Sequence, residues 1–167
     1  MTAYREGAQS LRPPRWVRAA WVLHRAIVRV SGGRIGLSRP EPGHQFGMLR
    51  LTTMGRRSGQ PRVAMVGYFE DGPNLVTLAM NGWGDSHPAW WLNLQAHPDT
   101  TVDLPDGPRV ARARAAAGAE HERLWAKFRE YPGWGDDIDA LSARRSIETA
   151  VVVLEPRHPV QPGGSPS

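Results

Sequence analysis

The sequence predicts a mainly β domain with added helices, in which six antiparallel strands close into a small barrel or a strongly curled sheet. Six short apolar runs follow one another, separated by turn signals such as Asp71-Gly72 and Pro105-Asp106-Gly107. The first three runs are joined by links too short for crossovers, so they should pair antiparallel. Closure of the sheet would also remove exposed strand edges.

The elements are expected in a simple order along the chain. Strands are predicted at 46–54, 63–69, 75–80, 100–104, 108–115 and 149–154. Helices are predicted at 88–96, 119–129 and 136–144, where apolar residues recur at helical spacing. The domain should therefore occupy 45–156, between an N-terminal extension (1–44) and a disordered tail (157–167) rich in Pro, Gly and Ser.

The N-terminal extension contains a predicted amphipathic helix at 15–30. Its apolar side carries Trp16, Leu23 and Ile27, and its arginines gather on the opposite face. Such a helix packs on the body of the domain or lies on an anionic membrane surface, which would give a cytoplasmic protein peripheral at the inner face of the cell membrane. Arginines interrupt the apolar segment, so a signal peptide is not expected.

The composition limits the classes of partner. A chain of 167 residues with 40% hydrophobic residues suits one core, and its net charge of +5 favours an anionic partner. Lys127 is the only lysine, so the basic charge is almost entirely arginine. No nucleic-acid-binding motif accompanies that charge, so nucleic acid is not expected as a partner. The absence of cysteine excludes disulfides and thiolate metal sites.

The segment from Gly55 to Arg62 (GRRSGQPR) is the strongest candidate for a binding site. It places three guanidinium groups, one hydroxyl and glycine-freed N–H groups within a single turn. Those donors suit a phosphate or a carboxylate, although arginines on a hairpin turn can also be simply solvated. The spacing is not that of a P-loop.

Two other constellations have less support. Asp85, Ser86 and His87 lie together, but hydrolase triads assemble from distant segments and no Gly-x-Ser-x-Gly elbow is present. The histidines lack the spacing of a metal site, so no metal is predicted. Trp90 and Trp91 are adjacent on a predicted helix, so one should enter the core while the other can cover a ring system or pack on neighbouring strands.

Taken in order, these segments resemble the deazaflavin-dependent nitroreductase family. The resemblance runs from about Ser31 to Pro156 and is carried by LTTMGRRSGQPR (51–62), LAMNG (78–82) and PAWWLNL (88–94). Members of that family are split-β-barrel proteins of actinobacteria that use reduced coenzyme F-420 to reduce quinones, nitro compounds and related acceptors. The resemblance therefore implies a six-stranded antiparallel split β-barrel and a hydride transfer from the deazaflavin C5.

The resemblance also assigns roles to residues. In such proteins the basic turn and the following strand hold the cofactor's phosphate and oligoglutamate tail, and the end of the third strand and the tryptophan helix border the deazaflavin. The cofactor-binding residues implied are Arg56, Arg57, Ser58, Arg62, Val63, Ala64, Met65, Leu78, Ala79, Met80, Asn81, Ala89, Trp90, Trp91 and Asn93.

The resemblance also implies that Gly67, Tyr131 and Trp134 line the acceptor pocket. Tyr131 or solvent would be the proton source. This sequence departs from the best-known members there: Met80 replaces a serine, Gly67 a tyrosine, and Trp134 and Asp137 tyrosines. The resemblance therefore implies cofactor binding more directly than nitroimidazole reduction. The expected substrate is a small hydrophobic acceptor.

Two alternatives use the same barrel. One is a non-catalytic carrier of a cofactor or lipid, and the other is an oxidoreductase that uses FMN, which also has a phosphate. The arginine-rich turn suits a long polyanionic tail better than a single phosphate. A monomer and a homodimer are both compatible with the sequence.

Overall fold

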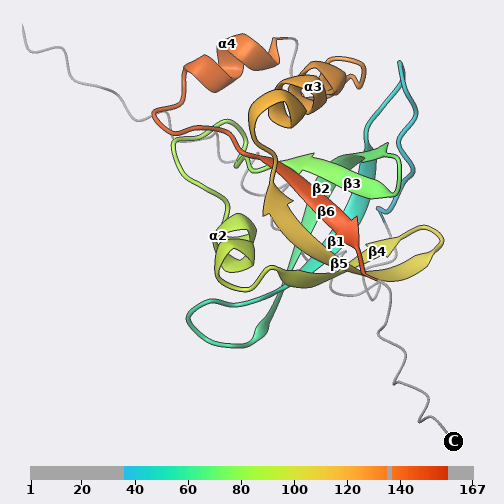
Figure 1. The fold of residues 1–167 in the computed structure, drawn as a ribbon, viewed down its shortest axis with the longest axis vertical. Coiled ribbons are helices and arrows are strands. Elements are labelled where there is room, and N and C mark those ends of the chain that lie inside the picture. The colour runs from blue at the N-terminus through green and yellow to red at the C-terminus, as the bar shows by residue number, and fades with distance from the viewer. Residues whose placement is uncertain (1–35, 135–136, 158–167) are drawn as a thin grey trace, which may run out of the picture. The chain divides into compact units, whose positions relative to one another are not determined.

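The computed structural model describes residues 36–134 and 137–157 and contains a closed barrel of six strands (Figure 1). The strands are β1 (Gly47–Met54), β2 (Pro61–Asp71), β3 (Asn74–Leu78), β4 (Asp99–Leu104), β5 (Gly107–Ala115) and β6 (Val151–Pro156). The helices are α2 (Ala89–Ala96), α3 (Gly118–Phe128) and α4 (Ile138–Ala143). The predicted helix at 15–30 and almost all of the predicted tail lie outside the described residues.

The strands pair in the order β1-β2-β3-β6-β5-β4, and pairing of β1 with β4 closes the barrel. Every pair is antiparallel, as predicted from the short links. Gly72 (φ 60°) and Gly107 (φ 129°) adopt positive φ in the two predicted hairpin turns. The prediction of a six-stranded antiparallel barrel with peripheral helices is therefore confirmed.

Several strand boundaries differ from the prediction, including that of β6, which runs from Val151 to Pro156 and not over 149–154. Strand β2 is longer than 63–69, because it continues its ladder with β1 back to Pro61 and reaches Asp71 opposite Asn74. Strand β3 ends at Leu78, two residues earlier than predicted, since the Met80 N–H turns back to the Leu78 carbonyl at 2.9 Å.

The barrel interior is filled by alternate residues of the strands. Leu49, Leu51, Val66 and Tyr68 belong to one buried cluster with residues from the other four strands. Trp91 and Leu94 of α2 join the same cluster, and α2 contacts β1, β2 and β5. Helix α2 therefore covers one part of the barrel and completes its core.

A second buried cluster lies on the outer face of the barrel, beneath α3. Phe69, Val76, Val151 and Val153 point away from the interior and pack with the apolar face of α3. Strands β3 and β6 are consequently buried on both faces, which explains their nearly continuous apolar sequences. Figure 1 shows α3 lying against the side of the barrel formed by β3 and β6.

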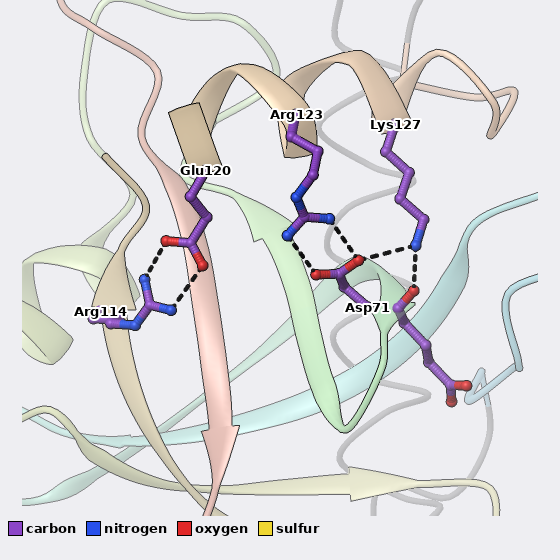
Figure 2. A network of polar contacts seen from close by, with 6 residues as sticks. Asp71, Arg114, Glu120, Arg123 and Lys127 are labelled. Atoms are coloured by element: carbon purple, nitrogen blue, oxygen red, sulfur yellow. Dashed lines mark hydrogen bonds and ion pairs between the residues drawn. The ribbon is translucent and has the colours of Figure 1, made fainter. Parts of the chain in front are cut away.

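Ion pairs connect α3 to the β2–β3 hairpin. Arg123 binds both carboxylate oxygens of Asp71, at 2.9 and 2.8 Å, and Lys127 lies 3.2 Å from the same carboxylate (Figure 2). The Lys127 ammonium also donates to the Glu70 carbonyl at 3.0 Å. At the start of the helix, Glu120 accepts two hydrogen bonds from Arg114 of β5, at 2.6 and 2.8 Å.

Asp71→Asn is expected to lower the free energy of unfolding by about 1 kcal/mol at neutral pH, because it removes two ion pairs that solvent only partly screens. The hydrogen bonds from Arg123 and Lys127 lower the pKa of Asp71 from 3.8 to about 2. The contribution of the Asp71 carboxylate to stability is therefore complete above about pH 3.8 and is lost as the pH falls through about 2.

Urea unfolding at successively lower pH measures this effect. The difference in free energy of unfolding between the wild type and Asp71→Asn should shrink as the pH falls. Asp99→Asn is the matched control, because the Asp99 carboxylate is 56% exposed and pairs with exposed arginines. An equal effect of both substitutions would contradict a specific role for the α3 ion pairs.

Candidate functional site

The basic turn lies between β1 and β2 and is held by its own backbone. The Gly55 N–H donates to the Gln60 carbonyl at 2.9 Å, and the Gly59 N–H donates to the Gly55 carbonyl at 2.8 Å. A Cβ atom at Gly55 would lie 2.7 Å from the Ser58 hydroxyl, and Gly59 has a φ of 62°. Both glycines are therefore required by the compact turn that gathers the arginines.

The side chain of Asn93 attaches this turn to α2. Its carbonyl oxygen accepts from the Arg56 backbone N–H at 3.2 Å and from the Arg56 guanidinium at 3.3 Å. Its amide donates to the Thr53 hydroxyl at 3.1 Å, and this hydroxyl donates to the Arg62 carbonyl at 3.4 Å. Asn93 is 4% exposed, so its polar atoms are used within the protein to position the turn.

The guanidinium groups of the turn differ in their ion pairing from most other arginines in the described part of the chain. Arg39, Arg50, Arg109, Arg112, Arg114, Arg123, Arg129 and Arg157 each form an ion pair. Arg56, Arg57 and Arg62 form none with any described carboxylate, and all three are exposed. No acidic residue occurs between Leu51 and Phe69. The turn therefore retains uncompensated positive charge for an external anion.

Strand β2 leads from this turn to the predicted acceptor side. Val63, Met65, Gly67 and Phe69 form its outward-facing row, since the alternate residues enter the interior cluster. At about 3.3 Å per residue, the row from Val63 to Phe69 is about 20 Å long. Strand β2 thus connects the predicted cofactor-tail site at the basic turn to the predicted acceptor side.

At the far end of this row, aromatic side chains pack on β2. Tyr131 stacks on Phe69 with ring centroids 5.2 Å apart. A Cβ atom at Gly67 would lie 2.9 Å from both the Trp134 and the Phe46 rings. Gly67, Tyr131 and Trp134 are therefore brought together, and Phe46 completes the group.

Two polar groups belong to this aromatic cluster, the Trp134 indole N–H and the Tyr131 hydroxyl. The Trp134 indole N–H is buried and has no hydrogen-bond partner in the structure. Burial, followed by the charges of Glu130 and Glu70, raises the pKa of Tyr131. The Tyr131 hydroxyl consequently stays protonated at neutral pH and can donate a hydrogen bond.

The remaining predicted cofactor residues lie where β3 ends and α2 begins. Leu78 and Ala79 are buried, Met80 is half-buried and packs on the outer cluster, and Asn81 is exposed. On α2, Trp91 is in the core, Trp90 is half-buried and Ala89 is exposed. Trp90 is thus the tryptophan with surface left to meet a ring system.

Two hollows lie near α3 and α4. The larger, of about 670 Å³, is lined by residues of both helices and of the 145–149 segment and contains no predicted site residue. The smaller, of about 470 Å³, is bordered by Tyr131, Gly133 and Ile138. The larger hollow therefore does not coincide with the basic turn, where the charge pattern indicates an anion site.

Comparisons with known proteins identify the family of the chain. Residues 21–156 match the family model described as F420H(2)-dependent quinone reductase. The chain belongs to this family. It is 35% identical over 139 residues to an F420H(2)-dependent quinone reductase of Mycobacterium tuberculosis, covering 81% of this chain and 89% of that protein.

Solved structures show the same fold. A structure described as an F420-H2 dependent reductase has a TM-score of 0.57 and 24% identity, covering 65% of this chain and 93% of that one. A structure described as a domain-swapped dimer has a TM-score of 0.61 and 22% identity, covering 83% and 99%. The predicted split barrel and the predicted enzyme class, an F-420-dependent oxidoreductase, are both confirmed.

Two structural findings concern membranes and metals. No helix in the described part of the chain is both long and apolar enough to cross a membrane. Among residues 36–134 and 137–157, no group of three or more histidine, cysteine, aspartate or glutamate side chains could hold a metal ion.

Several residues that contact the candidate site residues were not predicted from the sequence. Thr53 and Phe46 were assigned only to a strand, although the first anchors Asn93 and the second covers Gly67. Arg145 lies in a polar run and gave no signal, because its burial depends on contacts with a loop about 60 residues away in the sequence. A polar residue such as Thr53 on the inward face of a predicted strand was the one available clue.

Asn93→Ala is expected to lower the free energy of unfolding by about 2 kcal/mol, because it removes the hydrogen bond that the buried Thr53 hydroxyl accepts and leaves the Arg56 N–H without its partner. Urea unfolding monitored by tryptophan fluorescence measures this change. Gln95→Ala, an exposed position on the same helix, is the control and should have little effect. Equal stability of the two variants would show that Asn93 does not anchor the turn.

Proposed function

We propose that this F-420-dependent oxidoreductase transfers a hydride from the reduced cofactor to a quinone-like, nitroaromatic or other hydrophobic acceptor. The deazaflavin supplies the hydride, and the protein supplies binding, orientation and a proton donor. The observation that carries the proposal is the set of unpaired guanidiniums in the basic turn, at one end of the β2 row whose other end carries Tyr131 and Trp134.

The basic turn fits the phosphate and oligoglutamate tail. Arg56, Arg57 and Arg62 offer planar donor pairs that match phosphate and carboxylate oxygens, and Ser58 adds a hydroxyl. Arg62 already donates to Ser58 at 3.4 Å, so part of this donor set is organised before a ligand binds. The outward residues of β2, with Ala64 between them on the inner face, would then lead toward the ring.

The deazaflavin ring would lie against the end of β3 and the start of α2. The half-buried side chains of Met80 and Trp90 offer apolar surface there, and Asn81 offers an exposed amide. The buried neighbours Leu78, Ala79 and Trp91 would support these contacts from below. Apolar walls with a few polar groups are typical of cofactor sites.

The acceptor would lie beside Tyr131 and Trp134. The hollow bordered by Tyr131 has a volume of about 470 Å³, which is in the range of small-ligand sites. The Tyr131 hydroxyl is the proposed donor to an acceptor oxygen, because the Trp134 N–H is buried and Trp134 does not border this hollow. Gly67 and Phe46 set how close the indole ring can approach β2.

The direct test is titration of the purified protein with F-420 and, in parallel, with FMN, followed by oxidation of the reduced cofactor on addition of menadione. Tight F-420 binding with oxidation faster than in the protein-free control supports the proposal. Binding without turnover would indicate a carrier instead. Preferential FMN binding would overturn the assignment of the basic turn to an oligoglutamate tail.

Arg57→Gln is expected to weaken F-420 binding about threefold to tenfold, with a smaller effect at high salt, because it removes an exposed, unpaired charge without breaking an internal hydrogen bond. Equilibrium titration at two ionic strengths measures this effect. Arg112→Gln removes an exposed charge that is already paired with Asp99 and should leave affinity unchanged. Equal weakening by both substitutions would indicate only a net-charge effect.

Tyr131→Phe is expected to lower turnover with menadione about tenfold at neutral pH, because it removes a protonated hydroxyl but keeps the ring stacked on Phe69. Affinity for F-420 should be unchanged, which steady-state kinetics and titration together can establish. Full turnover and unchanged acceptor affinity would exclude Tyr131 as the proton donor and leave solvent in that role.

A further inference from the structure

The guanidinium of Arg145 is bound to a loop distant in the sequence. Arg145 follows α4 and is only 7% exposed. Its Nε donates to the Gly84 carbonyl at 3.0 Å, Nη2 to the Ser86 carbonyl at 3.2 Å, and Nη1 to the Ala79 carbonyl at 3.5 Å. Nη1 also donates to the Thr149 hydroxyl. One side chain thus binds three carbonyls of the 79–86 segment.

This cation lacks the partner that a buried charge normally has. Within the described residues it forms no ion pair, and burial lowers the pKa of Arg145 while the charge of Asp85 opposes that shift. The Asp85 carboxylate accepts instead from the Ser146 backbone N–H at 2.7 Å. Burying a guanidinium on neutral carbonyls is costly, but its planar fork is suited to hold several carbonyls in one geometry.

The 79–86 segment contains one residue, Trp83, in a strained backbone conformation. Trp83 has a φ of 61°, which is rare for a residue with a side chain, and Gly82 before it has a φ of 57°. The Trp83 indole N–H donates to the Trp134 carbonyl at 2.9 Å. The segment therefore joins Met80 and Asn81, at the end of β3, to the aromatic group around Trp134.

We propose that Arg145 is a positioning residue that holds the 79–86 segment in the conformation needed for turnover. Through the Ala79 carbonyl it sets the chain direction at Met80, and through Gly84 and Ser86 it holds Trp83 against Trp134. Arg145 is not among the residues proposed to bind the cofactor or the acceptor. The part of this inference that concerns turnover rests on the proposed function, whereas the part that concerns the segment does not.

The first test is hydrogen exchange of the full-length protein carrying Arg145→Lys. Lysine keeps the charge but cannot bind three carbonyls in one plane, so the amides of 80–87 should exchange about tenfold faster while those of β1 and β6 are unchanged. Arg144→Lys is the matched control, because Arg144 is adjacent and exposed. Unchanged exchange in the segment, or an equal increase throughout the barrel, would overturn the proposal.

The second test separates positioning from cofactor binding. Arg145→Lys should lower kcat with menadione about 10- to 100-fold while F-420 affinity, set mainly by the basic turn, changes less than about threefold. Guanidinium ion at non-denaturing concentration should partly restore turnover to Arg145→Ala but not to Tyr131→Phe. Normal kcat in Arg145→Lys would overturn the catalytic part of the proposal.

The two proposals can fail independently. If the wild-type protein does not oxidise reduced F-420 with menadione, the proposed function fails, and hydrogen exchange still decides whether Arg145 holds the segment. If the wild type turns over and the segment is unaffected by Arg145→Lys, the proposed function stands and the positioning role fails.

Discussion

The alternation of side chains along β2 is the constraint on which the core and the candidate site both depend. Val66 and Tyr68 fill the barrel, so Met65, Gly67 and Phe69 must face outward. A shift of one residue would exchange these sets and place the wrong side chains on each face. The ladder from Gly47–Tyr68 to Met54–Pro61 fixes this register, and barrel closure holds β1 in turn through β4.

The arginines divide into those that stabilise the fold and those that remain available to a ligand. Arg114 and Arg123 are held by carboxylates that connect α3 to the barrel. Arg56 is held by the neutral amide of Asn93, which orients its backbone without cancelling its charge. This difference gives the basic turn a fixed shape and an uncompensated potential, the two properties needed to bind a polyanion.

Local sequence patterns predicted the strands, the turns and the basic segment because these depend on residues close together in the chain. Asp71-Gly72 specifies its hairpin directly, and the arginines of the turn lie within eight residues. Arg145 could not be found in this way, since its carbonyl partners belong to another loop and backbone acceptors leave no trace in the sequence. The start of β6 was misplaced for a similar reason: Thr149 resembles a strand residue but binds Ser142 and Arg145 instead.

The aromatic group around Gly67 explains why acceptor choice is harder to infer than cofactor choice. A side chain at position 67 would collide with Trp134 and Phe46, so these three positions can change only together. Trp134 is further tied to Trp83, and through the 79–86 segment to Arg145. The proposed acceptor wall is therefore determined by packing among four separate segments of the chain, whereas the proposed anion site is contained in one turn. A departure from the family pattern at Gly67 thus alters the proposed acceptor side without disturbing the arginines proposed to bind the cofactor.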